Sequence, residues 1–192
     1  MKRAAWRTAM AGVRRADLVF LDASGASIRL TRAYARAPKR ERAVGRVPRN
    51  HGKATSLVAA LTPQGLRAPA RRLGARNADS FAAYVAGTLA PALRPGQVVV
   101  LDNLSVHKDP RVRAAVEAAG CRLVFLPPYS PDFSPIELAY AKVKAALRKA
   151  GARAQDALDA AAPQGVCDQA LATITPQDAA AFFRHCGYSL AQ

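Results

Sequence analysis

Cysteine is scarce in this sequence, and the few residues present lack the spacing of a metal or disulfide site. Cys121, Cys167 and Cys186 are far apart, and no Cys-x-x-Cys pair occurs. This pattern excludes a recognisable zinc cage and a disulfide framework. It favours reduced thiols in a cytoplasmic protein.

Long apolar runs are missing as well. A membrane-spanning helix needs about 20 consecutive apolar residues, and no segment approaches that length. Arg7, Arg14 and Arg15 interrupt the N-terminal stretch before it can form the apolar region of a signal peptide. We therefore expect no membrane partner.

Acidic residues are few relative to basic ones. Thirteen Asp and Glu residues stand against 29 Lys and Arg residues, which gives a formal net charge of +16. A protein this basic usually binds a polyanion, most often nucleic acid. The alternative is a cation-rich solvated surface in a proteome that is biased towards Arg.

The residues that are abundant form apolar runs that alternate with helical patterns. At 192 residues the chain suits one compact domain. The clearest strand is QVVVLDN (97–103), and the helix IELAYAKVKAALRKA (136–150) is closed by Gly151. Further strands are predicted at 18–22, 28–35, 54–65 and 121–127, an edge segment at 66–73, a loop at 36–53, and helices at 2–16, 77–93, 110–119, 156–173 and 176–185.

The order of these elements predicts an α/β fold. It runs β-β-β-α-β-α-β-α and ends in a helical tail. Continuous apolar strands followed by helices imply a sheet with helices on both faces. Pro69 cannot donate a ladder hydrogen bond, so the segment 66–73 is expected at an edge of the sheet.

Three acidic residues stand where secondary structure changes. Asp22 ends the first predicted strand, Asp102 ends the fourth, and Glu137 lies in the first turn of a helix. Strand ends in α/β sheets open into a crevice that commonly holds ligands. Carboxylates gathered there repel one another, so a cation is expected, and oxygen ligands select Mg²⁺ or Mn²⁺. Two such ions about 3.5–4 Å apart can activate a hydroxyl and stabilise the leaving oxygen of a phosphodiester.

Each carboxylate also has a structural interpretation. Asp is a frequent turn former after a strand, which would account for Asp22 and Asp102. Ser134, Pro135 and Glu137 match the N-cap, N1 and N3 positions of a capping box, so Glu137 would then only stabilise its helix.

The sequence segments around these residues resemble those of a known family. LDNLSVHK (101–108) and LPPYSPDFSPIELAYAKVKAALR (126–148) are similar to the two downstream signatures of DDE transposases of the insertion-sequence 630 and Tc–mariner superfamily. FLDASG (20–25) matches the strand that carries the first Asp, and 34 residues separate Asp102 from Glu137, as in the family. The resemblance extends from about residue 14 to about residue 150.

The resemblance implies a ribonuclease H-like mixed sheet and a metal-dependent DNA-cleaving and strand-transferring enzyme. Asp22, Asp102 and Glu137 correspond to the triad that binds two Mg²⁺ or Mn²⁺ ions. The implied partners are DNA (transposon ends and target) and a second copy of the chain, and the implied location is the nucleoid of a bacterium. The chain then divides into a short basic N-terminal segment (1–16), a catalytic domain (17–150) and a C-terminal helical tail (151–192).

Two departures from the family stand out. Family members often have Glu after the first Asp, whereas Ala23 stands here, and only 21 residues precede Asp22, where the family usually has a helix-turn-helix region. Ala23 is expected to alter the support of the first Asp rather than to inactivate the site. The missing region is expected of the second frame of a split gene, whose upstream frame encodes the helix-turn-helix partner. The alternative is an inactive truncated remnant or an accessory basic DNA-binding fragment. A third interpretation, another ribonuclease H-like nuclease such as a junction resolvase, leaves the Pro-Tyr-Ser-Pro signature unexplained.

Five further residues are candidates for contact with DNA. Asn103 and His107 share the loop of Asp102 and either contact a ligand or fix that loop by hydrogen bonds. Lys144 and Arg148 follow Glu137 at helical spacing, so they either meet phosphates or form a solvated helix face. Tyr129 either stacks on a base or anchors the proline turn.

Overall fold

The computed structural model describes residues 3–188 except 33, 48, 50, 51 and 153–164. The strands are β1 (Leu18–Ala26), β2 (Thr55–Thr62), β3 (Gly65–Leu73), β4 (Val98–Leu101) and β5 (Arg122–Phe125). The α-helices are α1 (Arg3–Ala11), α2 (Ala78–Tyr84), α3 (Pro110–Ala118), α4 (Pro135–Ala150), α6 (Val166–Ala172) and α7 (Pro176–His185). Short 3-10 or π turns are η1 (Arg15–Asp17), η2 (Val85–Leu89), η3 (Ala90–Ala92), η4 (Ser105–Lys108) and η5 (Pro131–Phe133).

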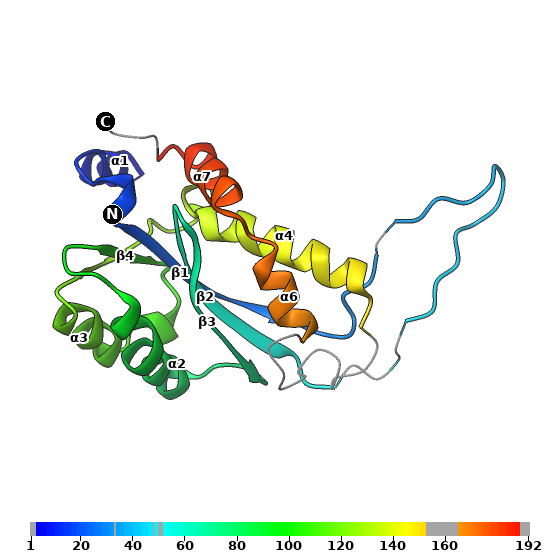
Figure 1. Ribbon diagram of the computed structural model, residues 1–192, viewed down its shortest axis with the longest axis horizontal. Coiled ribbons are helices and arrows are strands. Elements are labelled where there is room, and N and C mark those ends of the chain that lie inside the picture. The colour runs from blue at the N-terminus through cyan, green and yellow to red at the C-terminus, as the bar shows by residue number, and fades with distance from the viewer. Residues whose placement is uncertain (1–2, 33, 48, 50–51, 153–164, 189–192) are drawn as a thin grey trace.

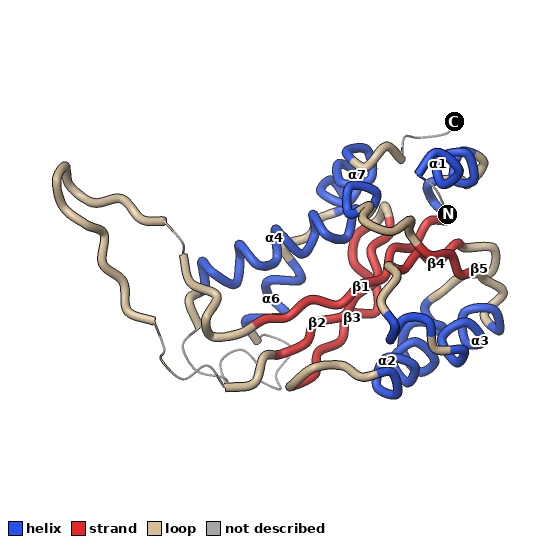
Figure 2. Tube along the Cα trace, turned by 180° about the vertical axis from the view of Figure 1, so that it is seen from behind, coloured by secondary structure: helices blue, strands red, loops and turns tan. Residues whose placement is uncertain are grey.

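The strands form one mixed sheet in the order β3-β2-β1-β4-β5. β1, β2 and β3 are antiparallel neighbours, whereas β4 and β5 run parallel to β1. Helices cover both faces: α4, α6 and α7 lie on one side of the sheet, and α2 and α3 lie on the other (Figures 1 and 2). The predicted α/β class with a two-sided sheet is therefore confirmed.

Alternation along β1 explains why both faces are covered. Leu18 and Phe20 pack in the core cluster under α4 and α7, whereas Val19 and Leu21 pack in the cluster under α2 and α3. All four side chains are buried because successive strand residues point to opposite faces. A strand that is apolar at every position thus needs a helical layer on each side.

The predicted strand at 28–35 is wrong. β1 continues past Asp22 to Ala26, and its antiparallel pairing with β2 continues to the Ala26–Thr55 pair. The chain then turns, with the amide of Leu30 donating to the carbonyl of Ser27 at 3.0 Å, and leaves the sheet. The predicted order of elements still holds because the segment at 66–73 forms a complete strand, β3.

β3 is the edge strand that Pro69 predicts. Between the Val58–Ala70 and Ala60–Arg67 pairs the register shifts, so Ala68 and Pro69 together face a single β2 residue. Ala68 takes a left-handed backbone with φ of 48°, and its carbonyl accepts a hydrogen bond from the Tyr84 hydroxyl at 2.7 Å. This bulge accommodates a residue without an amide donor inside a strand.

Between β1 and β2 the chain forms a long extension, which we call the basic arm (residues 27–54). It projects far from the sheet and its helices (Figures 1 and 2). From Arg36 to Val47 every residue is exposed, and Tyr34 and Val44 are 92% and 93% exposed. The predicted loop at 36–53 is confirmed for the residues that the structure describes.

The helices follow the sequence signals closely. Asn77 caps α2, and the predicted stripe of Phe81, Tyr84, Val85 and Leu89 is buried, although the predicted single helix at 77–93 changes to η2 and η3 after Tyr84. α4 and α7 occupy the predicted ranges almost residue for residue. The predicted tail helix at 156–173 is seen as α6, and its earlier part falls largely on residues 153–164, outside the described residues.

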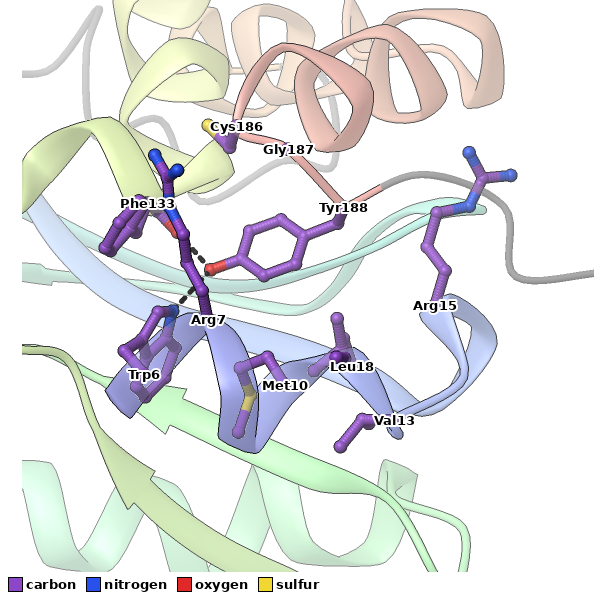
Figure 3. A pocket seen from close by; sticks show the side chains of 11 residues that line it. Trp6, Arg7, Met10, Val13, Arg15, Leu18, Phe133, Cys186, Gly187 and Tyr188 are labelled. Carbon is purple, nitrogen blue, oxygen red and sulfur yellow. Dashed lines mark hydrogen bonds between the residues drawn. The ribbon is translucent and has the colours of Figure 1, made fainter. Parts of the chain in front are cut away.

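The N-terminal helix α1 packs against the C-terminal end of the described chain (Figure 3). The indole of Trp6 donates to the Tyr188 hydroxyl at 3.2 Å, and that hydroxyl donates to the carbonyl of Phe133 at 2.7 Å. Arg3 donates to Ser130 at 3.0 Å and to Asp132 at 2.8 Å. The first and the last described residues, Arg3 and Tyr188, therefore both contact the loop that leads into α4. Across the described residues, no helix has the length and apolarity to cross a membrane.

Candidate active site

The register of β1 and β4 aligns Asp22 with Asp102. The last parallel pair is Phe20 with Val100, so Asp22 and Asp102 each lie two residues beyond it. Phe20 and Val100 belong to the same core cluster, and alternation along β1 points the Asp22 side chain to that same face, while Asp102 directly follows the end of β4. The sequence had predicted Asp22 at the end of the first strand. It lies inside β1 instead, because β1 continues to pair with β2 after its pairing with β4 has stopped. Its β4-facing edge is nevertheless open.

Glu137 comes to this edge from α4. Pro135 occupies the first turn of the helix, and Glu137 is the acidic residue of that turn. Ser134 is the N-cap, but its side chain makes no capping hydrogen bond, so the capping box that the sequence matches is not formed. The structural interpretation of Glu137 therefore loses its main support.

The charge of Asp102 raises the pKa of the other two carboxylates, Asp22 and Glu137. Burial raises the pKa of Asp22 to about 6, and the charges of Asp102 and Glu137 add to this rise, whereas a hydrogen bond from the Ala23 amide opposes it. Burial and the charge of Asp102 also raise the pKa of Glu137, and the charge of Lys144 opposes that rise. Such repulsion between carboxylates is expected at a site that gathers negative charge before a cation binds.

Asp102 is held differently from Asp22. Burial alone would raise the pKa of Asp102, but hydrogen bonds from His107 and the Leu104 amide outweigh it and lower the pKa. His107 Nδ1 lies 2.5 Å from Asp102 Oδ1, and the Leu104 amide donates to the same oxygen at 3.0 Å. The His107 ring is 2% exposed and lies on Phe81 with 4.4 Å between ring centroids. Asp102 is therefore an ionised group in a fixed position.

The two loop candidates behave as fixing residues. Asn103 donates its side-chain amide to the carbonyl of Leu126, which ties the Asp102 loop to the end of β5. His107 is buried and bound to Asp102, so contact with DNA is not available to it in this conformation. These contacts favour the loop-fixing alternative for both residues.

Lys144 and Arg148 lie further along α4 on the side of Glu137. Lys144 is close enough to Glu137 for its charge to affect the pKa of that carboxyl. Both side chains are half-buried rather than fully solvated. Tyr129, in contrast, is 99% exposed and takes a left-handed backbone with φ of 51°, so it does not anchor the proline turn by packing.

Two neighbouring cavities open at this edge. Asp102 and Glu137 line one of about 480 Å³, together with the proline-rich loop that includes Tyr129. Asp22 and His107 line another of about 310 Å³. Leu104 borders both cavities, so the two are adjacent.

Two residues near the carboxylates were not predicted. Tyr140 donates its hydroxyl to the Asp22 carbonyl at 2.9 Å, which ties α4 to β1 beside the site. Its place three residues after Glu137 was a signal, because residues at i and i+3 share a helix face. Arg76 lines the cavity of Asp22. Nothing in its local sequence distinguished it from the other arginines.

The donor set suits a hard divalent cation. Asp22, Asp102 and Glu137 offer carboxylate oxygens at one edge of the sheet, and such oxygens are what Mg²⁺ and Mn²⁺ prefer. However, no three His, Cys, Asp or Glu side chains in the part of the chain that the structure describes are grouped tightly enough to form a finished metal site. The chemistry of the three residues fits a divalent metal ion.

The fold has close counterparts among solved structures. The Mos1 mariner paired end complex with Mn matches with a TM-score of 0.71 and 17% identity, covering 95% of this chain and 56% of that chain. The catalytic domain of Mos1 mariner transposase matches with a TM-score of 0.55 and 14% identity, covering 96% of this chain and 89% of that one. A simian T-cell lymphotropic virus intasome matches with a TM-score of 0.55 and 13% identity, covering 84% and 49%. This chain is thus ribonuclease H-like in fold and spans little more than half of the first of these relatives.

A comparison by sequence places the chain in a family. No curated protein matches it. The sequence model of the DDE superfamily endonuclease family matches residues 17–159, which is most of the chain. The chain is therefore a member of the DDE superfamily endonuclease family, with the catalytic-domain fold of a mariner-type transposase.

Proposed function

We propose that this chain is a transposase catalytic domain that cleaves DNA at transposon ends and transfers the freed 3′ end to target DNA. The observation that carries the proposal is the register of β1 and β4, which aligns Asp22 with Asp102. The charges of Asp102 and Glu137 raise the pKa of Asp22, and the charge of Asp102 raises the pKa of Glu137, which supports the proposal.

The three carboxylates would together hold two Mg²⁺ or Mn²⁺ ions, which activate the attacking hydroxyl and stabilise the leaving oxygen. Solved structures of Mos1 with Mn and with Mg support this choice of metal. Asp102 is ionised and fixed by His107, so it is ready to bind without a change in protonation. Asp22, with a pKa of about 6, holds its proton more readily and releases it when a cation compensates its charge.

DNA is the proposed partner because of the charge. The net charge of +16 supplies affinity for phosphates whatever the base sequence. We assign phosphate contacts to Lys144 and Arg148 on α4. Recognition of the ends is proposed to lie in a helix-turn-helix partner that a separate upstream frame encodes, and paired ends would bring two copies of the chain together.

Three substitutions test the proposal. Asp22→Asn, Asp102→Asn and Glu137→Gln should each abolish Mg²⁺- or Mn²⁺-dependent cleavage of duplex DNA and leave the chain folded, because each removes a charged ligand of nearly unchanged shape. The exposed carboxylates of Asp79 and Glu117 give matched controls, and Asp79→Asn and Glu117→Gln should cleave like the wild type. If any one triad variant keeps near wild-type cleavage, that residue is not a metal ligand.

Fusing the upstream frame to the chain tests the split-gene proposal. The isolated chain should bind end and scrambled duplexes about equally, with steep salt dependence, and the fusion should prefer the ends. A preference for the ends by the isolated chain would place recognition inside this domain. Absence of cleavage by both wild-type forms would favour an inactive remnant or an accessory DNA-binding fragment.

A further inference from the structure

Arg76 lies between β3 and α2 and faces the cavity next to the first carboxylate. It lines the same cavity of about 310 Å³ as Asp22. The wall around it includes the small residues Gly25, Ala54, Gly74 and Ala75, together with the larger side chains of Phe81 and Leu104.

The Nε atom of Arg76 lacks a polar partner among the described residues. This nitrogen is fully buried and has no hydrogen-bond acceptor, and no ion pair found in the part of the chain that the structure describes includes Arg76. Its central carbon lies 5.3 Å from the centroid of the Tyr84 ring. The hydroxyl of Tyr84 is bound to the Ala68 carbonyl at the β3 bulge, so the ring that supports Arg76 is fixed in place.

This arrangement is unfavourable in the absence of an anion. A buried donor without an acceptor is destabilising, and a cation loses solvation on burial. Burial lowers the pKa of Arg76, and the positive charge of Arg72 lowers it further. Two cations are therefore close together, and for Arg76 no acidic side chain among the described residues offsets the charge.

We propose that Arg76 binds a phosphodiester oxygen of the DNA strand that enters the site beside Asp22. This inference rests on the proposed function. The planar guanidinium donates through Nε and Nη in a fork that matches two phosphate oxygens, which a Lys ammonium does not reproduce. Such a phosphate would lie in the same cavity as Asp22, and Arg76 would offset part of the negative charge of the phosphate.

A structural role and a phosphate-binding role predict opposite changes in stability. If Arg76 binds phosphate, Arg76→Gln removes a cation that has no partner, so the melting temperature of the DNA-free protein stays the same or rises. Arg67 on β3 is exposed and provides a matched control for the loss of charge. Arg76→Gln and Arg76→Lys should both slow cleavage by about 10- to 100-fold, because the strand is displaced at the reacting position, whereas Arg67→Gln should not.

A second measurement keeps the test independent of activity. The NMR signal of the Arg76 Nε–H can be identified by its absence in Arg76→Gln. This signal should shift when a random-sequence duplex of about 20 base pairs is added in the presence of Ca²⁺. An unmoved signal at saturating DNA, or a lower melting temperature of Arg76→Gln with unchanged cleavage, overturns the proposal. If wild-type protein and triad variants are equally inactive, the proposed function fails, and the signal still decides whether Arg76 binds phosphate.

Discussion

Between Arg29 and Lys53 the basic arm carries nine Lys and Arg residues and a single acidic residue, Glu41. All nine cationic side chains are exposed, and the arm projects away from the sheet (Figure 1). The carboxylate edge is built in the opposite way, with Asp22 inside a strand, Asp102 fixed by a buried His107 and Glu137 in the first turn of a long helix.

Under the proposed function, the two kinds of charge have different tasks. Attraction between a cation and the phosphate backbone depends little on exact position, so charge on an exposed loop is sufficient for it. Metal-dependent phosphoryl chemistry needs ligands at defined positions, which rigid strands and helices supply. Affinity and chemistry are therefore expected to respond to different substitutions.

The largest effect should come from neutralising the basic arm, which should change DNA affinity but not stability. Replacing five of its cations with Gln (Arg36, Lys39, Arg40, Arg42 and Arg46) should weaken binding to random duplex roughly 100-fold or more at physiological salt and reduce the salt dependence. The free energy of unfolding should change by less than about 0.5 kcal/mol, because exposed side chains contribute little. A control that removes Arg15, Arg94, Arg113, Arg122 and Lys149 instead should lose less affinity. Equal losses in a salt-titrated binding assay would mean that the arm has no special part.

The next effect concerns the carboxylate edge, where a substitution should increase stability. The pKa of Asp22 rises from 3.8 to about 6 on folding, so the folded state holds this proton more tightly than the unfolded chain. Stability of the metal-free protein therefore falls as pH rises from about 4 to about 6, by roughly 3 kcal/mol at most. Asp22→Asn should remove this loss and raise the melting temperature at pH 7 while abolishing cleavage. Thermal melts of the wild type and of Asp22→Asn at pH 4 and pH 7 measure this change in stability. A lower melting temperature of Asp22→Asn than of the wild type at pH 7 would contradict the burial of this carboxylate.

A smaller effect is expected at His107. His107→Gln weakens the hydrogen bond to Asp102 and should lower the free energy of unfolding by about 1–2 kcal/mol. Its hydrogen bond helps to hold the pKa of Asp102 below the usual value, and such stabilisation is present above the unfolded pKa and lost as pH falls. The deficit of the variant should therefore shrink in acid. Chemical denaturation at two pH values tests this, and binding to random duplex should remain at the wild-type level.

The smallest effect is expected at Ala23. Ala23→Glu introduces the residue that DDE transposases often have after the first Asp, so cleavage should not fall. Ala23 is only half-buried, which leaves its side chain a route to solvent. A loss of metal binding, measured by titration calorimetry, would mean that the site has adapted to the short side chain.

The sheet and most helices could be predicted because their signals are local. The β-branched run before Asp102, the Asn77 cap and Gly151 at the end of α4 each determine structure within a few residues. The length of β1 was not local information. Whether residues 23–26 extend the strand depends on pairing with β2, which begins 29 residues further on, at Thr55.

The candidate site also has features that local sequence signals predict and features that they do not. The identity of the three carboxylates was predicted from their positions in the sequence and from family resemblance, and it remains a prediction. The contacts of His107 and Arg76 could not be predicted, because they depend on which residues the fold brings beside them. His107 is buried by Phe81 from α2, and Arg76 is supported by Tyr84 from the same helix.

The contact between α1 and Tyr188 has a consequence for the order of folding. Trp6 and Tyr188 are 182 residues apart in sequence, and both belong to the core cluster beneath α4. On the ribosome, α1 emerges long before this hydrogen-bond partner, which follows Trp6 by 182 residues. Such distant contacts slow folding, because a long loop must close before they form. Until then the apolar side of α1 remains without its final cover, so nascent chains should depend on protection from aggregation during synthesis.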